Sequence, residues 1–260
     1  MKIGLFDSDA AALKQRIQSN ERFGSNDLNL WIFAQLDVQA GMRVLDLGCG
    51  TGKQTLPLAQ SVGEHGHVTG VDISADALAE LRREAVNSGV TDRIETVCTG
   101  LDDFARMTEL ATFERAVSSY SLYYARDPKA VVLKVNERLE AGGIVFVCGP
   151  AKDNNAELIA LVSALKGQVA PAVSASARTM EDDLPAWAKD TFDEVTISRF
   201  ENRVAFDSPG ALHDYWSSHN LFDPELDSEF TAAAERHFSS HSRFENVKRA
   251  IGVRAEKRAR

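Results

Sequence analysis

The sequence predicts an α/β fold in which a parallel β-sheet is covered by helices on both faces. Five short apolar segments recur between residues 44 and 148, and each has the length and composition of a buried strand. Stretches with helical periodicity and capping residues separate them. Strands that alternate with helical crossovers form a parallel sheet, because each crossover packs on one of its faces.

The five predicted strands cover residues 44–47, 68–72, 94–98, 113–118 and 144–148. The predicted crossover helices cover residues 53–61, 77–88 and 129–139. Ser74 and Asp127 supply capping side chains for the second and third of these helices. Gly89 is expected to end the second helix, and Gly142-Gly143 the third.

The regions on either side depart from this alternation. Residues 8–38 are predicted to be helical and precede the first strand. After residue 150 the sequence predicts helices at 155–166, 209–218 and 224–238, strands at 192–200, 204–206 and 244–253, and a small-residue loop at 171–179. This later region is more elaborate than a crossover needs, so we expect it to carry substrate specificity.

The composition indicates a soluble globular protein. Of the 260 residues, 44% are hydrophobic and 26% are charged. A net charge of −9 disfavours nucleic acid and membrane surfaces as partners. The three cysteines, at 49, 98 and 148, are too few and too scattered for a disulfide framework, and no segment resembles a membrane span or a signal peptide. We therefore expect a cytoplasmic protein.

A loop with alternating glycines, Gly48, Gly50 and Gly52, follows the first strand directly. Glycines let the backbone approach a ligand closely, and the next helix points its first N–H groups at that ligand. A phosphate-binding P-loop is rejected because the glycine spacing is one residue short and Gln54 stands where Ser or Thr should hold magnesium. A dinucleotide fingerprint is disfavoured because its third glycine would come one residue later.

Two acids beside this loop favour an adenosyl ligand without a diphosphate. Asp46 would repel a diphosphate but attract a cation. Asp72 ends the second strand, where a carboxylate can accept hydrogen bonds from both hydroxyls of a ribose. The alternative for Asp72 is a helix cap, but Ser74 already supplies one.

These residues resemble one known family. Val-Leu-Asp-Leu-Gly-Cys-Gly-Thr-Gly at 44–52, Val-Thr-Gly-Val-Asp-Ile-Ser at 68–74 and Leu-Glu-Ala-Gly-Gly at 139–143 are together similar to the class I S-adenosylmethionine-dependent methyltransferases. The resemblance covers about residues 40–150 and is closest to the small-molecule enzymes related to quinone C-methyltransferases.

The resemblance implies a doubly wound, Rossmann-like sheet of seven strands whose last strand is antiparallel. Strands six and seven would be residues 192–200 and 244–253. Residues 1–40 would form an N-terminal helical lid and residues 41–150 the cofactor-binding core. Residues 151–260 would cap the substrate and complete the sheet, within a single domain overall.

The resemblance also implies a cofactor site for S-adenosylmethionine. The glycines would line its methionine and ribose parts, Asp46 would lie near the amino group, and Ile73 would pack on the adenine. Phe23 in the lid would lie near the ligand. The full expected set is Asp46, Gly48, Cys49, Gly50, Thr51, Gly52, Asp72, Ile73, Leu101, Ser118, Ser119 and Phe23.

The residues that follow the third and fourth predicted strands also belong to the implied cofactor site. The Asp-Ala pair that the family often has after its third strand is Gly100-Leu101 here. Leu101 can still offer its backbone N–H, and the missing acid would be replaced by Asp102 or Asp103. After the fourth strand, residues 118–120 would face the sulfonium.

As the family implies, a nucleophile on the substrate attacks the sulfonium methyl group, and a general base is needed only if that nucleophile starts protonated. Tyr124 and His213 are weak candidates for such a base, and packing roles are the alternative for both. His237 and His241 have metal-ligand spacing but lack a third ligand, so no metal is expected.

The sequence thus predicts a methyltransferase acting on a small organic molecule, with an O, N or C acceptor left open. The alternatives are an RNA or protein methyltransferase, or a non-catalytic adenosyl-binding subunit. Neither nucleic acid nor membrane is expected as a partner, and a homodimer is left open.

Overall fold

The computed structural model describes residues 22–166, 171–219 and 221–258. The chain divides into two compact units. The sheet unit comprises residues 29–150, 176–199 and 251–260, and the helical unit comprises residues 1–28, 151–175 and 200–250. No helix of the described residues is long and apolar enough to cross a membrane.

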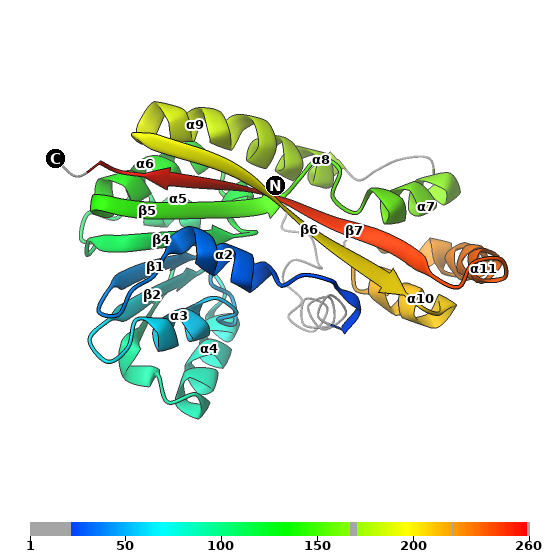
Figure 1. Cartoon of the computed structure of the whole chain (residues 1–260), viewed down its shortest axis with the longest axis horizontal. Coiled ribbons are helices and arrows are strands. Elements are labelled where there is room, and N and C mark those ends of the chain that lie inside the picture. Colours follow the sequence, from blue (N-terminus) through cyan, green and yellow to red (C-terminus); the bar gives the residue numbers. More distant parts are fainter. Residues whose placement is uncertain (1–21, 167–170, 220, 259–260) are drawn as a thin grey trace. The chain divides into compact units, whose positions relative to one another are not determined.

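Seven strands form one sheet in the order β3-β2-β1-β4-β5-β7-β6 (Figure 1). Their bounds are β1 Arg43–Leu47, β2 His67–Asp72, β3 Ile94–Cys98, β4 Phe113–Ser119, β5 Leu139–Pro150, β6 Glu194–Phe206 and β7 Phe244–Glu256. The first five pair in parallel, and β7 is antiparallel to β5, as the exchange between Lys257 and the Gly142-Gly143 backbone shows. The expected seven-stranded sheet with an antiparallel last strand is confirmed.

The helices are α2 Leu28–Leu36, α3 Thr55–Ser61, α4 Ala75–Asn87, α5 Leu101–Phe104, α6 Pro128–Arg138, α7 Ala156–Lys166, α8 Pro171–Arg178, α9 Leu184–Thr191, α10 Pro209–Ser217 and α11 Asp227–Phe238. Short 3₁₀ turns cover Thr91–Arg93, Leu122–Tyr124 and Pro224–Leu226, and a π turn covers Thr179–Asp183. In the sheet unit, α2, α3 and α4 lie on one face of the sheet, and α5, α6 and α9 lie on the other (Figure 1).

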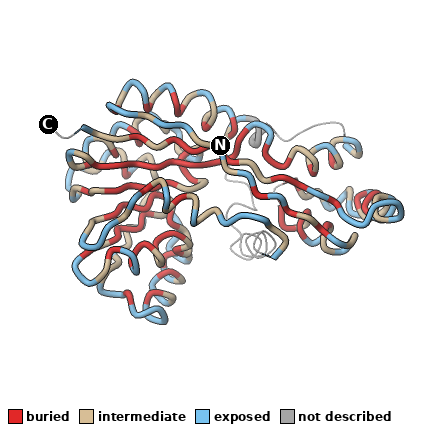
Figure 2. Tube along the Cα trace, viewed as in Figure 1, coloured by how far each residue is buried: buried red, intermediate tan, exposed pale blue. Residues whose placement is uncertain are grey.

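Alternation along β5 explains why both faces of the sheet are covered. Val145 and Val147 belong to the apolar cluster that includes α6 and α9. Phe146 lies between them in sequence and points to the opposite face, where its ring meets Trp31 of α2 edge-on at a centroid distance of 5.0 Å. Figure 2 shows that β5 is buried along most of its length. A strand buried on both faces has to be apolar throughout.

The helical unit has a hydrophobic core of its own. Trp216 of α10 stacks on Phe230 of α11 with ring centroids 3.9 Å apart. Phe206 at the end of β6 packs against Tyr215, with centroids 5.0 Å apart. These large side chains are almost completely buried, so the unit can fold around them.

Some predicted elements were wrong in detail. Residues 171–178, expected as a loop, form α8, because alanine and serine without glycine are compatible with a helix. The two strands expected at 192–200 and 204–206 are one strand, β6. Gly142-Gly143 lies within β5, since α6 already ends at Arg138. Residues 8–21 of the helical prediction at 8–38 fall outside the described residues, and α2 confirms its last part.

Gly252 provides a test of the packing between α2 and the sheet. A β-carbon at this position would lie 2.4 Å from Phe146 Cζ and 2.6 Å from Trp31 Cη2. Gly252→Ala should therefore lower the free energy of unfolding by about 1–3 kcal/mol, the usual cost of overpacking. The matched control is Gly210→Ala in α10, where the part of the chain that the structure describes has no atom within 4 Å of the new methyl group. Urea unfolding should show the control unchanged or more stable, and equal losses in both variants would contradict this packing.

Candidate functional site

The loop between β1 and α3 is shaped by its three glycines, whose φ angles are +73°, +54° and +93° at Gly48, Gly50 and Gly52. A β-carbon at Gly48 would lie 2.2 Å from Ser121 Cβ, and one at Gly52 would lie 2.3 Å from Leu81 Cδ1. A β-carbon at Gly50 would have no atom of the described residues within 4 Å. The first and third glycines are therefore required by packing, whereas the middle one faces open space that a ligand can enter.

Asp72, at the end of β2, holds this loop. Its Oδ2 accepts a hydrogen bond from the Gly50 N–H at 2.8 Å, and its Oδ1 accepts one from the Ser74 N–H at 2.8 Å. Each carboxylate oxygen can accept more than one hydrogen bond. Asp72 can therefore hold the loop and still accept hydroxyl groups of a ligand above Gly50.

Asp46 of β1 is only 1% exposed and accepts a hydrogen bond from the Thr55 hydroxyl at 2.6 Å. Burial raises the pKa of this carboxyl to about 7, with a smaller contribution from the negative charge of Asp72. Near neutral pH this carboxyl is therefore only about half ionised. A cation nearby would favour its charged form, so this side chain suits a positively charged ligand.

The end of β2 also presents an exposed apolar surface. Ile73 is 66% exposed, and its Cδ1 would lie 3.5 Å from a β-carbon at Gly100. Leu101 follows directly as the first residue of α5. A large exposed aliphatic side chain beside a glycine and a backbone N–H provides the flat apolar contact that an adenine ring needs.

Asp102, considered as a replacement for the family's acid, is engaged elsewhere. Its carboxylate accepts the backbone N–H groups of Arg126 at 2.9 Å and Asp127 at 3.0 Å. Burial would raise the pKa of Asp102, but these hydrogen bonds outweigh it and lower the pKa. Asp102 thus ties α5 to the start of α6. Asp103 forms an exposed ion pair with Arg106 at 2.9 Å.

The serines after β4 connect that strand to β1. The Ser121 hydroxyl donates to the Leu47 carbonyl at 2.6 Å, so Ser118 is the donor in the 2.6 Å bond between the two serine hydroxyls. The neighbouring Ser119 hydroxyl accepts a hydrogen bond from the Cys148 thiol at 3.6 Å. The ends of β1, β4 and β5 are thereby fixed together.

The two buried cysteines near the site are not nucleophiles. Burial raises the pKa of the Cys49 thiol, and the charges of Asp46 and Asp72 raise it further. Burial likewise raises the pKa of Cys148 to about 12. Both thiols stay protonated at neutral pH and fill space. Cys98 is exposed, and its thiol lies 3.8 Å from the Ile73 carbonyl.

The structure brings most of the expected cofactor residues to one edge of the sheet unit. Asp46, Asp72, Ile73, Leu101, Ser118 and Ser119 lie at or just beyond the carboxyl ends of β1 to β4, beside the loop that contains Cys49 and Thr51. Ligands of open α/β sheets bind at this edge. The grouping supports the expected site, and the role of each residue stays a prediction.

Three expected residues belong to the other unit or have other contacts. Phe23 belongs to the helical unit and packs on Phe206 with ring centroids 5.5 Å apart. His213 belongs to the same unit, and its Nε2 lies 2.8 Å from Asp227 Oδ1. Tyr124 of the sheet unit is 40% exposed and packs on Tyr123. Their roles toward a ligand stay predictions.

A pair of side chains that the sequence did not predict fixes the far end of the loop. Gln54 Nε2 donates to Asn29 Oδ1 at 2.8 Å, and Asn29 Nδ2 donates to the Lys53 carbonyl at 3.1 Å. Gln54 stands at the helix start without capping it, and it is only 7% exposed. A polar side chain that leaves its own helix uncapped points to a distant partner, but the sequence does not identify Asn29.

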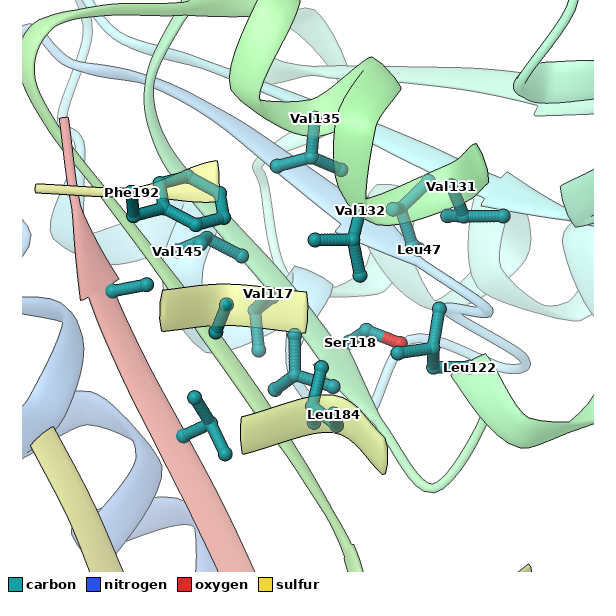
Figure 3. A pocket seen from close by; sticks show the side chains of 14 residues that line it. Leu47, Val117, Ser118, Leu122, Val131, Val132, Val135, Val145, Leu184 and Phe192 are labelled. Carbon is teal, nitrogen blue, oxygen red and sulfur yellow. The ribbon is translucent and has the colours of Figure 1, made fainter. Parts of the chain in front are cut away.

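An apolar cavity of about 20 Å³ lies between the sheet and the helices α6 and α9 (Figure 3). Ser118 is its one polar lining residue, and the others include Leu47, Val132, Leu184 and Phe192. This volume is about that needed for one water molecule. The cavity is a packing defect of the core and is too small for an adenosyl group.

The loop and its neighbours fit S-adenosylmethionine. The space above Gly50 has no β-carbon, Asp72 has acceptor capacity for ribose hydroxyls, and Asp46 favours a cation. For the residues that the structure describes, no cluster of three or more His, Cys, Asp or Glu side chains could hold a metal ion. His237 and His241 stack on each other, with centroids 4.5 Å apart.

Comparison with known sequences gives one family match. A family model described as a methyltransferase domain matches residues 38–195. This range contains β1 to β5, the glycine loop and Asp72.

Individual proteins agree with this match. The chain is 31% identical over 110 residues to aklanonic acid methyltransferase DauC of Streptomyces sp. (strain C5), covering 42% of this chain and 49% of that protein. It is 31% identical over 125 residues to a ubiquinone biosynthesis O-methyltransferase of Idiomarina loihiensis, covering 48% of this chain and 49% of that protein. The chain thus spans about half the length of the curated relatives it matches.

The solved structure of the YcgJ protein from Bacillus subtilis shares the fold. Its TM-score is 0.57 at 15% sequence identity, and the match covers 89% of this chain and 98% of that one.

The raised pKa of the Asp46 carboxyl predicts that the stability of the protein depends on pH. The unfolded chain ionises this carboxyl near pH 4, but the native state keeps its proton until about pH 7. The native state therefore binds more protons between these values, and stability falls as pH rises through this window. Asparagine does not ionise, so Asp46→Asn lacks this loss. The difference in the free energy of unfolding between the variant and the wild type should therefore shift by about 2–3 kcal/mol in favour of the variant from pH 5 to pH 8.

Urea unfolding at the two pH values measures this difference. Asp103→Asn is the matched control, because its carboxylate is exposed, and it should show no such change. A gain for Asp46→Asn that is equal at both pH values would contradict the raised pKa.

Proposed function

The chain belongs to the methyltransferase domain family, and on this premise we propose that it transfers a methyl group from S-adenosylmethionine to a small organic molecule. One observation carries the proposal. Gly50 has no described atom within 4 Å of its β-carbon position, its N–H is held by Asp72, and the adjacent strand carries the buried carboxyl of Asp46. A loop of this kind accepts a nucleoside, and its two acids favour one that carries a positive charge.

The cofactor, when bound, supplies a methyl group activated by the sulfonium charge. We propose that Asp72 binds the ribose hydroxyls, that Ile73 and Leu101 contact the adenine, and that Asp46 favours the cationic end. The remaining members of the proposed set are Gly48, Cys49, Gly50, Thr51, Gly52, Ser118, Ser119 and Phe23. These residues position the ligand and exclude water, which is the main contribution a protein can make to such a transfer.

A small organic acceptor is supported by the names of the relatives, which refer to aklanonic acid and to ubiquinone biosynthesis. The net charge of −9 disfavours RNA as the acceptor. We propose that the helical unit carries the acceptor specificity. Tyr124 and His213 are the proposed candidates for a general base, needed only if the acceptor atom starts protonated.

Transfer of labelled methyl groups tests this function. The protein is incubated with methyl-labelled S-adenosylmethionine and, in turn, a small-molecule extract, RNA and protein. Label in the small-molecule pool is expected. Label in RNA or protein would replace the proposed acceptor class, and tight cofactor binding without label in any pool would indicate a non-catalytic binding subunit.

Substitution of Asp72 tests the cofactor site. Asp72→Asn replaces one acceptor oxygen with a donor, so it should weaken binding of S-adenosylmethionine by about 1–3 kcal/mol, the cost of an unpaired polar group. Asp76→Asn is the matched control, because Asp76 lies exposed in the first turn of α4. Calorimetric titration measures both. An affinity for Asp72→Asn equal to that of the control would refute the ribose assignment.

A further inference from the structure

Gln54, directly before α3, has a buried side chain that does not cap the helix. The residue stands at the N-cap position, but its side chain makes no hydrogen bond to the first turn of α3. Gln54 is only 7% exposed. A buried amide needs partners for its polar atoms, and the residues that favour an N-cap position find them in the helix that follows. Gln54 instead contributes its amide to a contact outside α3.

This contact is with the first turn of α2, which lies 25 residues earlier in the chain. Gln54 Nε2 donates to Asn29 Oδ1 at 2.8 Å, and Asn29 Nδ2 donates to the Lys53 carbonyl at 3.1 Å. One amide of α2 thus uses both of its polar atoms on two consecutive residues, which fixes their position and their orientation. We name this arrangement of Asn29, Lys53 and Gln54 the amide clamp.

The helix α2 gives the amide clamp a fixed point, because the helix is anchored to the sheet. Ile32 and Leu36 are completely buried, and Trp31 meets Phe146 of β5 edge-on. At the end of the helix, Arg115 Nε donates to the Leu36 carbonyl at 2.5 Å. A positive charge at the C-terminal end of a helix also interacts favourably with the helix dipole.

The glycine loop therefore has two anchors of different origin. At one end, the Gly50 N–H donates to Asp72 of β2. At the other end, the amide clamp joins the chain to a helix that packs on β5. The chain between these anchors contains Gly50 and Gly52, and glycine has more accessible backbone conformations than any other residue. Holding both ends restricts this freedom in the segment beside which we place the ligand.

We propose that Asn29 and Gln54 are positioning residues for the cofactor, and that through them the packing of α2 sets the affinity of the glycine loop for S-adenosylmethionine. The inference rests on the proposed function. A ligand that binds an ordered loop does not lose affinity by ordering it, so a loop held at both ends binds more tightly than one held at a single end. Neither residue has to touch the cofactor for this effect.

Calorimetric titration of the full chain with S-adenosylmethionine tests the amide clamp and needs no acceptor. Gln54→Met nearly keeps the side-chain volume but removes the donor, and Asn29→Ala removes the other partner. Each should weaken binding by about fivefold, the order expected for one lost hydrogen bond. The double variant should lose clearly less than the product of the two single losses, because the two residues act together. The matched control is Gln60→Met, the same change at an exposed position of α3, which should leave the affinity unchanged.

Gly252→Ala tests the role of α2. The added methyl group would meet Trp31 of α2 and Phe146 of β5, so it disturbs the packing of the helix without removing a member of the amide clamp. It should weaken binding of S-adenosylmethionine by about threefold in the wild type and should have no further effect in the Gln54→Met variant. This difference between the two backgrounds measures the coupling between the packing of α2 and the glycine loop.

The outcomes separate this inference from the proposed function. If the wild type does not bind S-adenosylmethionine, the proposed function fails, and this inference fails with it. If the wild type binds, but Gln54→Met and Asn29→Ala bind within twofold of it, the amide clamp serves stability alone, and the inference is overturned while the function stands. Single losses that multiply in the double variant, or an equal effect of Gly252→Ala in both backgrounds, would likewise overturn it.

Discussion

The hydrogen bond from the Gly50 N–H to Asp72 is the interaction on which the site depends. It joins the loop after β1 to the end of β2, and the neighbouring N–H groups of Gly48 and Cys49 reinforce it by donating to the Val71 carbonyl. The loop can follow this path because its three glycines adopt positive φ angles and because Gly48 has no β-carbon to meet Ser121. The absence of a β-carbon at Gly50 leaves space for a ligand beside the contact that orders the loop.

Electrostatics distinguish this loop from the glycine-rich loops that bind phosphate. In those loops the helix N-terminus and a positive side chain favour an anion. Here the carboxyls of Asp46 and Asp72 lie at the ends of adjacent strands, and Asp46 is buried with one hydroxyl partner. Burial raises the pKa of Asp46, and a positively charged ligand nearby would favour its charged form.

We propose that the two units have different tasks, cofactor binding in the sheet unit and acceptor specificity in the helical unit. The sheet unit contains the glycine loop and its partners. The helical unit has an independent aromatic core and a buried polar group in which Asn155 contacts both His219 and Asn246. Because each unit has its own core, residues of the helical unit can change with the acceptor while the geometry around Gly50 is preserved. This arrangement supports the proposal that acceptor specificity resides in the helical unit.

The sequence by itself determined the strands β1 to β5, the glycine loop and the acids beside it, because these depend on local patterns of burial and spacing. It did not determine α8 or the length of β6, where local propensity is weak. Only the tertiary structure decided that Ser121 fills the space beside Gly48, that Gln54 binds Asn29 and that Asp102 serves the loop before α6. Each depends on which distant segments meet, and that follows from the packing of the whole sheet unit rather than from any short stretch of sequence.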